Sequence, residues 1–250
     1  MSEPMTLVTI FATFLLAGSV KGVIGLGLPT VSLALLSLAF DLPHAMALLL
    51  VPSFVTNLWQ GLSGGNTSAI LKRLWPFMLM ATGMVWIGAL ALTRVDLNLL
   101  SALLGAMLVA YAGLGLAGYR LSVAPAREVW AGPLLGTANG ILTGMTGSFV
   151  VPGVMFLQSI GLPRDMLIQS MGMLFTVSTL ALALALGGNG LLSTEQGLLS
   201  ASGVVPAIIG MVLGQRIRSR LSEDLFRRLF FIALLVLGGY IMMRALGRIA

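Results

Sequence analysis

The sequence lacks cysteine altogether and contains a single histidine, His44. Without cysteine the chain cannot form disulfides, thiolate metal sites or thiol nucleophiles. A single histidine cannot build a metal site of several histidines. We therefore expect neither a metal nor a cofactor in this protein.

Charged residues are also scarce. They make up 9% of the 250 residues, against 58% hydrophobic residues, whereas a soluble domain carries about 25% charged residues. The chain has too few polar side chains to cover a water-facing surface, so we expect a membrane protein. The net charge is +6, but the basic residues stand in short loops between apolar runs. This pattern indicates membrane orientation and not nucleic-acid binding. Residues 1–4 contain one charged residue, the acidic Glu3. A signal peptide begins with a basic region, so we do not expect one here.

Uncharged runs fill most of the chain. Several have the length of one spanning helix, about 20 residues: 44–71, 74–93, 97–119, 166–194, 196–215 and 229–243. The uncharged run 129–163 and the run 4–40, in which only Lys21 is charged, are longer. As single helices they would exceed 50 Å, at about 1.5 Å per residue, in a hydrocarbon core of about 30 Å. Both contain central glycines, so we predict two helices in each, joined by a glycine-rich break. The pair is either a re-entrant hairpin or two short spans.

Residue types recur between the two parts of the chain, 118 to 130 positions apart: Gly18 and Gly136, Gly22 and Gly140, Pro76 and Pro206, Tyr111 and Tyr240. Such self-similarity predicts an internal repeat. We expect two similar halves, residues 1–120 and 121–250, within one membrane domain.

The positions of the basic residues predict how the halves are oriented. If each long run enters the membrane and returns, ten Lys and Arg lie on one side and three on the other, with Lys21 left out. The positive-inside rule favours this topology and places both termini outside. The second half is then inverted relative to the first. The predicted fold is an all-α integral membrane protein with two inverted repeats, each a glycine-broken helix pair plus three transmembrane helices. Secondary transporters often have this plan, with the binding site between the breaks near the midplane.

Lys21 is the one charge far from any loop, and we place it inside the first break, GSVKGVIGLGLP (18–29). A buried cation in a membrane is a functional hypothesis by default, and here it would bind an anion. The alternative is a side chain that snorkels to lipid headgroups. The sequence leaves both open.

Other candidates present neutral donors to a substrate. Glycines near the breaks can expose backbone N–H groups, although tight helix packing is their alternative role. With Lys21, the predicted substrate-binding residues are Gly22, Gly25, Gly27, Asn57, Asn139, Gly140, Thr143, Gly144, Gly147, Ser148 and Gln169. Polar residues elsewhere in the spans, including Ser178, are expected to form interhelical hydrogen bonds.

The two breaks, the Leu-Pro turns that follow them and the segment 204–243 resemble the sulfite exporter TauE/SafE family of membrane permeases. The resemblance implies export of sulfite, an organosulfonate or a carboxylate across a bacterial inner membrane. The chain departs from the family pattern at Leu28 and Pro29, where more glycine is usual, and at Thr146 and Ser148 around the second break.

The predicted function is secondary transport of small anions through a central site between the breaks. No carboxylate lies in the middle of a span, so export would be driven by the membrane potential, about 2.3 kcal/mol per charge per 100 mV. An anion channel is the alternative. An intramembrane enzyme is disfavoured because His44 stands beside a loop proline and no acidic pair suits a metal. The expected partners are the anion and membrane lipid; the oligomeric state is left open.

Overall fold

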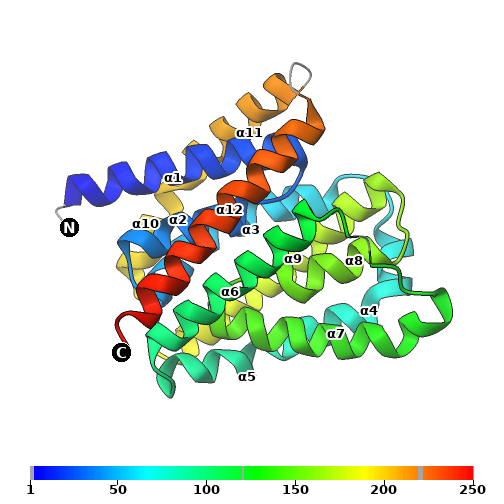
Figure 1. The fold of residues 1–250 in the computed structure, drawn as a ribbon, viewed down its shortest axis with the longest axis horizontal. Coiled ribbons are helices and arrows are strands. Elements are labelled where there is room, and N and C mark those ends of the chain that lie inside the picture. The colour runs from blue at the N-terminus through cyan, green and yellow to red at the C-terminus, as the bar shows by residue number, and fades with distance from the viewer. Residues whose placement is uncertain (1–2, 120, 219–221, 250) are drawn as a thin grey trace. The chain divides into compact units, whose positions relative to one another are not determined.

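The computed structural model describes residues 3–119, 121–218 and 222–249, and every regular element in these ranges is helical (Figure 1). Arg120 and Arg220, two of the basic residues counted for topology, lie outside the described residues.

The helices of the first half are α1 (Glu3–Ile24), α2 (Leu28–Ala39), α3 (Leu42–Leu62), α4 (Thr67–Gly83), α5 (Val85–Ala89), η1 (Leu90–Thr93) and α6 (Leu97–Leu116). Those of the second half are α7 (Pro125–Thr146), η2 (Val150–Val154), α8 (Met155–Ser159), α9 (Arg164–Gly188), α10 (Thr194–Ser202), α11 (Val204–Arg218) and α12 (Glu223–Leu246).

Seven segments of the described ranges are long and apolar enough to cross a membrane: Pro4–Ile24, Leu42–Leu62, Thr67–Thr93, Leu97–Leu116, Arg164–Gly188, Thr194–Arg218 and Asp224–Leu246. The predicted all-α membrane fold is confirmed. Each predicted helix pair is present but unequal. The 22-residue helices α1 and α7, about 33 Å long, are followed by short apolar helices, Leu28–Ala39 and Val150–Ser159.

The breaks are shorter than the glycine runs that predict them. α1 stays helical to Ile24, and the chain turns at Gly25 and Gly27, whose φ angles are 80° and 110°. The second break begins at Gly147, with φ of 74°. Residues with a Cβ rarely adopt these angles, so glycine is needed here. The prediction that Lys21 lies inside the break is wrong, because the helix continues through the preceding glycines and Lys21 belongs to its last turn.

The helix continues because its glycines serve close packing. A helical glycine is less favourable than alanine by about 1 kcal/mol, and backbone contacts with another helix offset this. In α1, Gly18 and Gly22 lie against the carbonyl groups of Ala207 and Met211 on α11. Glycines at such interfaces let membrane helices approach closely. The helices α1 and α11 accordingly run side by side (Figure 1).

The chain forms two compact units. Unit 1 comprises Met1–Pro52, Val95–Tyr119 and Leu191–Ala250. In it α1 packs along α11, and α6 along α12. A Cβ added at Gly105 of α6 would lie 2.6 Å from the carbonyl oxygen of Gly238 on α12. Unit 1 is therefore built from two glycine-mediated helix pairs.

Unit 2 comprises Ser53–Arg94 and Arg120–Gly190. Here α7 packs against α4 and α5. A Cβ at Gly136 would lie 2.5 Å from the carbonyl oxygen of Phe77, and one at Gly140 would lie 2.7 Å from that of Ala81. The Phe77 ring also packs on Phe156 of α8, with ring centroids 4.8 Å apart.

Each unit takes helices from both predicted halves, so the compact units are not the halves themselves. Their glycine contacts nevertheless correspond. Gly18 meets Ala207 in unit 1 and Gly136 meets Phe77 in unit 2. Gly136 stands 118 positions after Gly18, and Ala207 stands 130 positions after Phe77, which are the spacings of the sequence repeat. The correspondence supports the repeat, while the inversion of one half stays a prediction.

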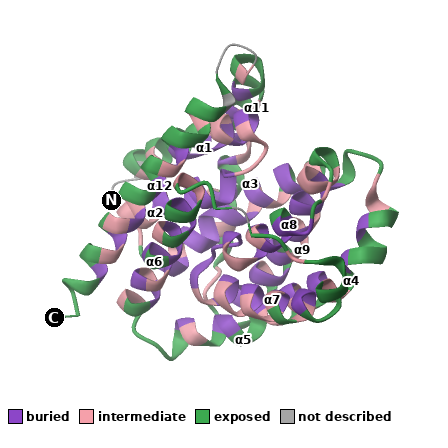
Figure 2. Cartoon of the chain, turned by 45° about the vertical axis from the view of Figure 1, so that its right-hand side comes forward, coloured by how far each residue is buried: buried purple, intermediate pink, exposed green. Residues whose placement is uncertain are grey.

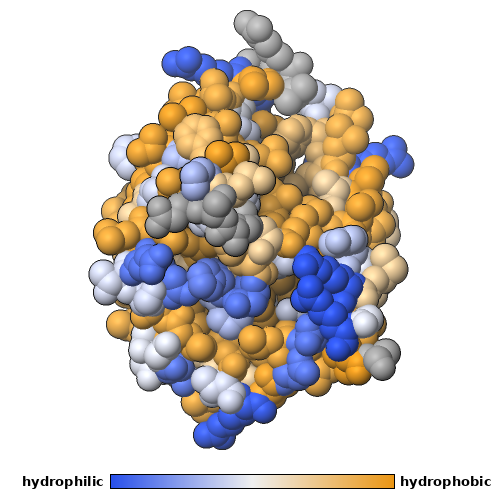
Figure 3. Space-filling view, turned by 90° about the vertical axis from the view of Figure 1, so that its left-hand side faces the viewer, coloured by the Kyte–Doolittle hydropathy of each residue, from blue (hydrophilic) through white to orange (hydrophobic). Residues whose placement is uncertain are grey.

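The surface is strongly apolar. Figure 3 shows a face on which hydrophobic side chains dominate, with hydrophilic groups in separate patches. Exposed residues run along the length of α12 and along α1 as far as Leu16 (Figure 2), and many are large hydrophobic ones. All four tryptophans, Trp59, Trp75, Trp86 and Trp130, are exposed. Water-soluble proteins seldom expose large contiguous apolar areas, whereas lipid-facing helices do, and tryptophan is enriched at membrane interfaces.

Candidate functional site at the second helix break

The second break leads the chain back along α7. Thr143 Oγ1 donates a hydrogen bond to the carbonyl oxygen of Ser148 at 2.9 Å, and the backbone N–H of Gly153 donates to Asn139 Oδ1 at 2.9 Å. Residues four apart on a helix lie on one face, so Asn139 and Thr143 together hold the segment 148–153 against one side of α7. Within this segment Val151 is extended, with φ of −112° and ψ of 124°.

The hydrogen bond from Gly153 also orients the amide of Asn139. Its oxygen faces an N–H donor, so its Nδ2 group points elsewhere and has no partner among the described residues. Asn139 is completely buried. The hydroxyl of Ser148, on the break itself, is buried as well and has no partner within the described ranges.

The break packs against α9 through an aromatic contact. The ring centroids of Phe149 and Phe175 are 5.7 Å apart. Ser178 and Thr179 follow Phe175 by three and four residues, so they share its face one turn further on. Both are buried, and neither hydroxyl has a partner in the described part of the chain.

These hydroxyls differ from their neighbours on the same helix. Thr176 Oγ1 donates to the carbonyl oxygen of Gly172 at 2.7 Å, and Ser170 Oγ donates to that of Leu167 at 2.8 Å. Such bonds to the preceding turn are the usual way to satisfy serine and threonine within a helix. Ser178 and Thr179 do not make them.

We call Asn139, Ser148, Ser178 and Thr179 the donor cluster. Ser53 of α3 carries one more buried hydroxyl in unit 2 that has no partner in the part of the chain that the structure describes. Leaving a buried donor or acceptor unpaired costs about 1–3 kcal/mol, and such groups are few in native proteins. The donor cluster offers amide N–H and hydroxyl O–H groups, which are suited to the lone pairs of an oxyanion.

Three of the predicted glycines lie in helix contacts. Gly140 and Gly144 of α7 face the backbones of α4 and α5, and a Cβ at Gly144 would lie 2.5 Å from the nitrogen of Ala89. Gly22 faces α11, with its added Cβ 2.9 Å from the Cα of Gly214. We therefore assign these three to packing. Gly25, Gly27 and Gly147 form the breaks themselves.

Gln169 has a structural role at the turn between α3 and α4. Its Oε1 accepts from the backbone N–H of Asn66 at 2.9 Å, and its Nε2 donates to the carbonyl oxygen of Gly61 and to Thr67 Oγ1, each at 3.0 Å. With these partners the amide is occupied without a substrate. Asn57, the other predicted amide on α3, is completely buried.

Lys21 is the buried cation of unit 1. It lies in the last turn of α1, and only 4% of the residue is exposed. The negative end of the helix dipole favours a cation at this position. Snorkelling would require the charged end of the side chain to reach the headgroup layer, whereas this residue is enclosed by the protein. The structure thus favours a role inside the protein.

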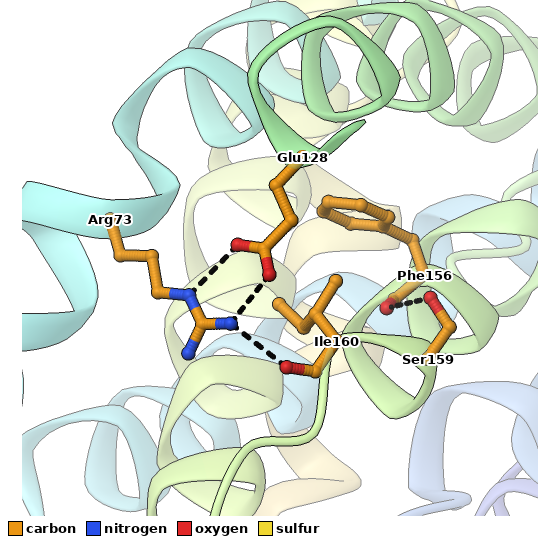
Figure 4. Close-up of polar contacts among 5 residues, drawn as sticks. All are labelled: Arg73, Glu128, Phe156, Ser159 and Ile160. Atoms are coloured by element: carbon orange, nitrogen blue, oxygen red, sulfur yellow. Dashed lines mark hydrogen bonds and ion pairs between the residues drawn. The ribbon is translucent and has the colours of Figure 1, made fainter. Parts of the chain in front are cut away.

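Arg73 joins three elements of unit 2 at one end of α8 (Figure 4). Its Nε and Nη2 donate to Glu128 Oε2 and Oε1 at 2.9 and 2.6 Å, and Nη2 also donates to the carbonyl oxygen of Ile160 at 2.8 Å. This two-pronged pairing is specific to arginine. Sequence reasoning treated Arg73 only as a topology signal, because nothing local links it to Glu128, 55 residues away.

The comparisons with known proteins identify the family. The family model "Sulfite exporter TauE/SafE" matches residues 10–241. No curated protein and no solved structure matches the chain. The match spans nearly the entire sequence and includes both helix breaks, so the chain belongs to the sulfite exporter TauE/SafE family.

Proposed function

We propose that this protein is a secondary exporter of small sulfur oxyanions, either sulfite or an organosulfonate, and that its substrate binds at the second helix break. The observation that carries the proposal is the set of buried donors at the second break and on α9 that have no hydrogen-bond partner among the described residues. Such groups are unfavourable in a membrane protein unless something binds them. Membership of a sulfite exporter family supports the class of substrate.

Lys21 is the proposed source of positive charge in unit 1. A buried cation in a membrane-spanning helix is rare and is usually retained for function. An anionic substrate gives this lysine a purpose that packing alone does not. We keep the first break, with Gly25 and Gly27, as the second element of the proposed transport machinery.

The membrane potential is the proposed driving force. The acidic residues whose burial the structure describes lie at or near the starts of helices: Asp41, Asp96, Glu128, Asp165, Glu195 and Asp224. A proton or sodium relay usually needs a carboxylate deep in the membrane. Outward movement of an anion from a cell that is negative inside needs no such relay.

The proposed location is a bacterial inner membrane with both termini outside. This orientation gathers ten of the fourteen basic residues on the cytoplasmic side, in accordance with the positive-inside rule.

The test is charge movement in proteoliposomes. The purified protein would be reconstituted in liposomes, and the external concentration of sulfite, sulfoacetate, chloride or acetate would be raised abruptly. The pH would be equal on both sides of the membrane, and liposomes without protein would be the control. We expect a saturable current with the sulfur anions. Absence of both current and tracer flux with every sulfur anion would contradict the proposed function, and unitary currents in a planar bilayer would indicate a channel.

A further inference from the structure

We infer that the hydroxyls of Ser178 and Thr179 on α9 are ligands of the substrate, and that with Asn139 and Ser148 they bind a three-oxygen sulfur anion in preference to a carboxylate. The inference rests on the proposed function, because it assigns the substrate of that exporter to particular side chains. Sequence reasoning had placed Ser178 among ordinary interhelical contacts.

The first step is placement. The Phe149–Phe175 contact, with centroids 5.7 Å apart, sets the break against the face of α9 that carries both hydroxyls. Ser148 immediately precedes Phe149. Asn139 is tied to the same segment through its bond from Gly153. The hydrogen bond thus ties Asn139 to this segment, and the aromatic contact brings the segment to Phe175, one helical turn before Ser178 and Thr179.

The second step is chemistry. Asn139 has its oxygen occupied by Gly153, so it presents N–H donors only. The three hydroxyls each have one proton to donate. A sulfonate or sulfite group has three acceptor oxygens and a negative charge, and hydrogen bonds to charged acceptors are stronger than neutral ones. The N–H and O–H donors of the cluster can therefore form hydrogen bonds to the three oxygens of such a group.

The third step is the contrast with a packing role. A threonine that only fills space on this helix can donate to its own preceding turn, as Thr176 does to Gly172. Ser178 and Thr179 do not make that bond, and although buried they have no hydrogen-bond partner among the residues that the structure describes. Bound substrate would satisfy them and offset the penalty of leaving them unpaired.

Selectivity follows from the number of acceptors. A carboxylate brings two oxygens, so it leaves more of the cluster unpaired than a sulfonate does. Sites built to hydrogen-bond a substrate group reject analogues that lack it, because their buried polar groups are then unsatisfied. Methanesulfonate should therefore bind more tightly than acetate, which carries the same methyl group.

The experiment compares Ser178→Ala and Thr179→Val with the matched control Thr176→Val, all three on α9. The apparent affinity for methanesulfonate, sulfite and acetate would be measured by charge movement and by ligand-induced thermal stabilisation. We expect each of the first two substitutions to weaken methanesulfonate and sulfite binding about tenfold or more, the loss for a hydrogen bond to a charged group. The Thr176→Val variant should retain the affinity of the wild type.

Folding is controlled in two ways. Removing an unpaired buried hydroxyl should leave the melting temperature unchanged or raise it. Thr179→Ser keeps the hydroxyl while altering the packing, and it should retain most of the affinity. If Ser178→Ala and Thr179→Val fold and bind methanesulfonate as tightly as the wild type, the inference is overturned while the exporter stands. If the wild type moves no sulfur anion, the proposed function fails, and the inference fails with it.

Discussion

The side-chain oxygen of Asn139 accepts a hydrogen bond from the backbone N–H of Gly153 at 2.9 Å, across the second helix break. This bond fixes which end of the amide faces the returning chain. It satisfies a buried backbone donor and leaves the amide N–H groups for another partner. Asn139 therefore has two roles: its oxygen stabilises the break, and its N–H groups are proposed to bind the substrate.

The two roles of Asn139 can be separated by substitution. Asn139→Leu leaves the Gly153 N–H unpaired, so we expect a loss of stability of about 1–3 kcal/mol, measured by thermal unfolding in detergent. Asn139→Asp keeps the acceptor but presents a carboxylate to an anion, so transport should fall at least about tenfold. Thr137→Val on the same helix is the control, since its hydroxyl bonds only to Pro133 of its own helix. Equal stability of Asn139→Leu and wild type would contradict the structural role.

The glycines of α7 are expected to be intolerant of a methyl group. In Gly140→Ala the new Cβ would lie 2.7 Å from the carbonyl oxygen of Ala81, and backbone cannot yield as a side chain can. We expect a destabilisation of about 1–3 kcal/mol, seen as a lower melting temperature. Gly113→Ala is the control, because this helical glycine has nothing within 4 Å and alanine is the better helix former. The assignment of Gly140 to packing would fail if Gly140→Ala were as stable as Gly113→Ala.

The Arg73–Glu128 pair is expected to contribute measurably to stability. The Arg73 side chain is 37% exposed and that of Glu128 13%, so solvent weakens the attraction. A double-mutant cycle with alanine should give a coupling energy of about 1 kcal/mol. Arg73→Lys should lose most of it, because lysine cannot make the two-pronged contact. Lys72→Ala, at an exposed neighbour, should have little effect. A coupling energy near zero would show that the pair is incidental.

We expect transport to require the positive charge of Lys21. The variant Lys21→Met should lose the current elicited by sulfite, whereas Lys21→Arg should keep part of it. Lys72→Met is the control, since Lys72 is exposed. The measurement is charge movement in proteoliposomes, with folding checked by size-exclusion chromatography. A full current in folded Lys21→Met would return this lysine to a structural role at the end of α1.

The predicted orientation can be tested because the chain has no cysteine of its own. Val95 and Ser63 lie in loops on opposite sides of the predicted topology, and both are exposed. In intact cells a membrane-impermeant maleimide should label Val95→Cys but not Ser63→Cys, while both should react after permeabilisation. The reverse labelling pattern would place the termini in the cytoplasm.

Several site features lay beyond sequence reasoning for a common reason. Thr143 and Ser148 are candidates because they are polar residues near the glycines of the second break, and Asn139 is one because it stands 118 positions after Lys21 in the repeat. Ser178 and Thr179 look like ordinary helix residues in the sequence. The sequence around a serine or threonine does not show whether its hydroxyl bonds to its own helix. Gln169 was a candidate for the substrate, but its partners at Asn66, Gly61 and Thr67 lie about a hundred residues away.

The sequence by itself determined that this protein is helical and embedded in lipid, and that each of its two longest apolar runs contains a break. These properties follow from composition and from the length and glycine content of each apolar run, because lipid permits few alternatives. Only the tertiary structure decided that most helical glycines serve packing, that Arg73 binds Glu128, and which buried donors stay unpaired. Each of these depends on which distant segment lies opposite a side chain, and hydrogen bonding and close contact are properties of such pairs.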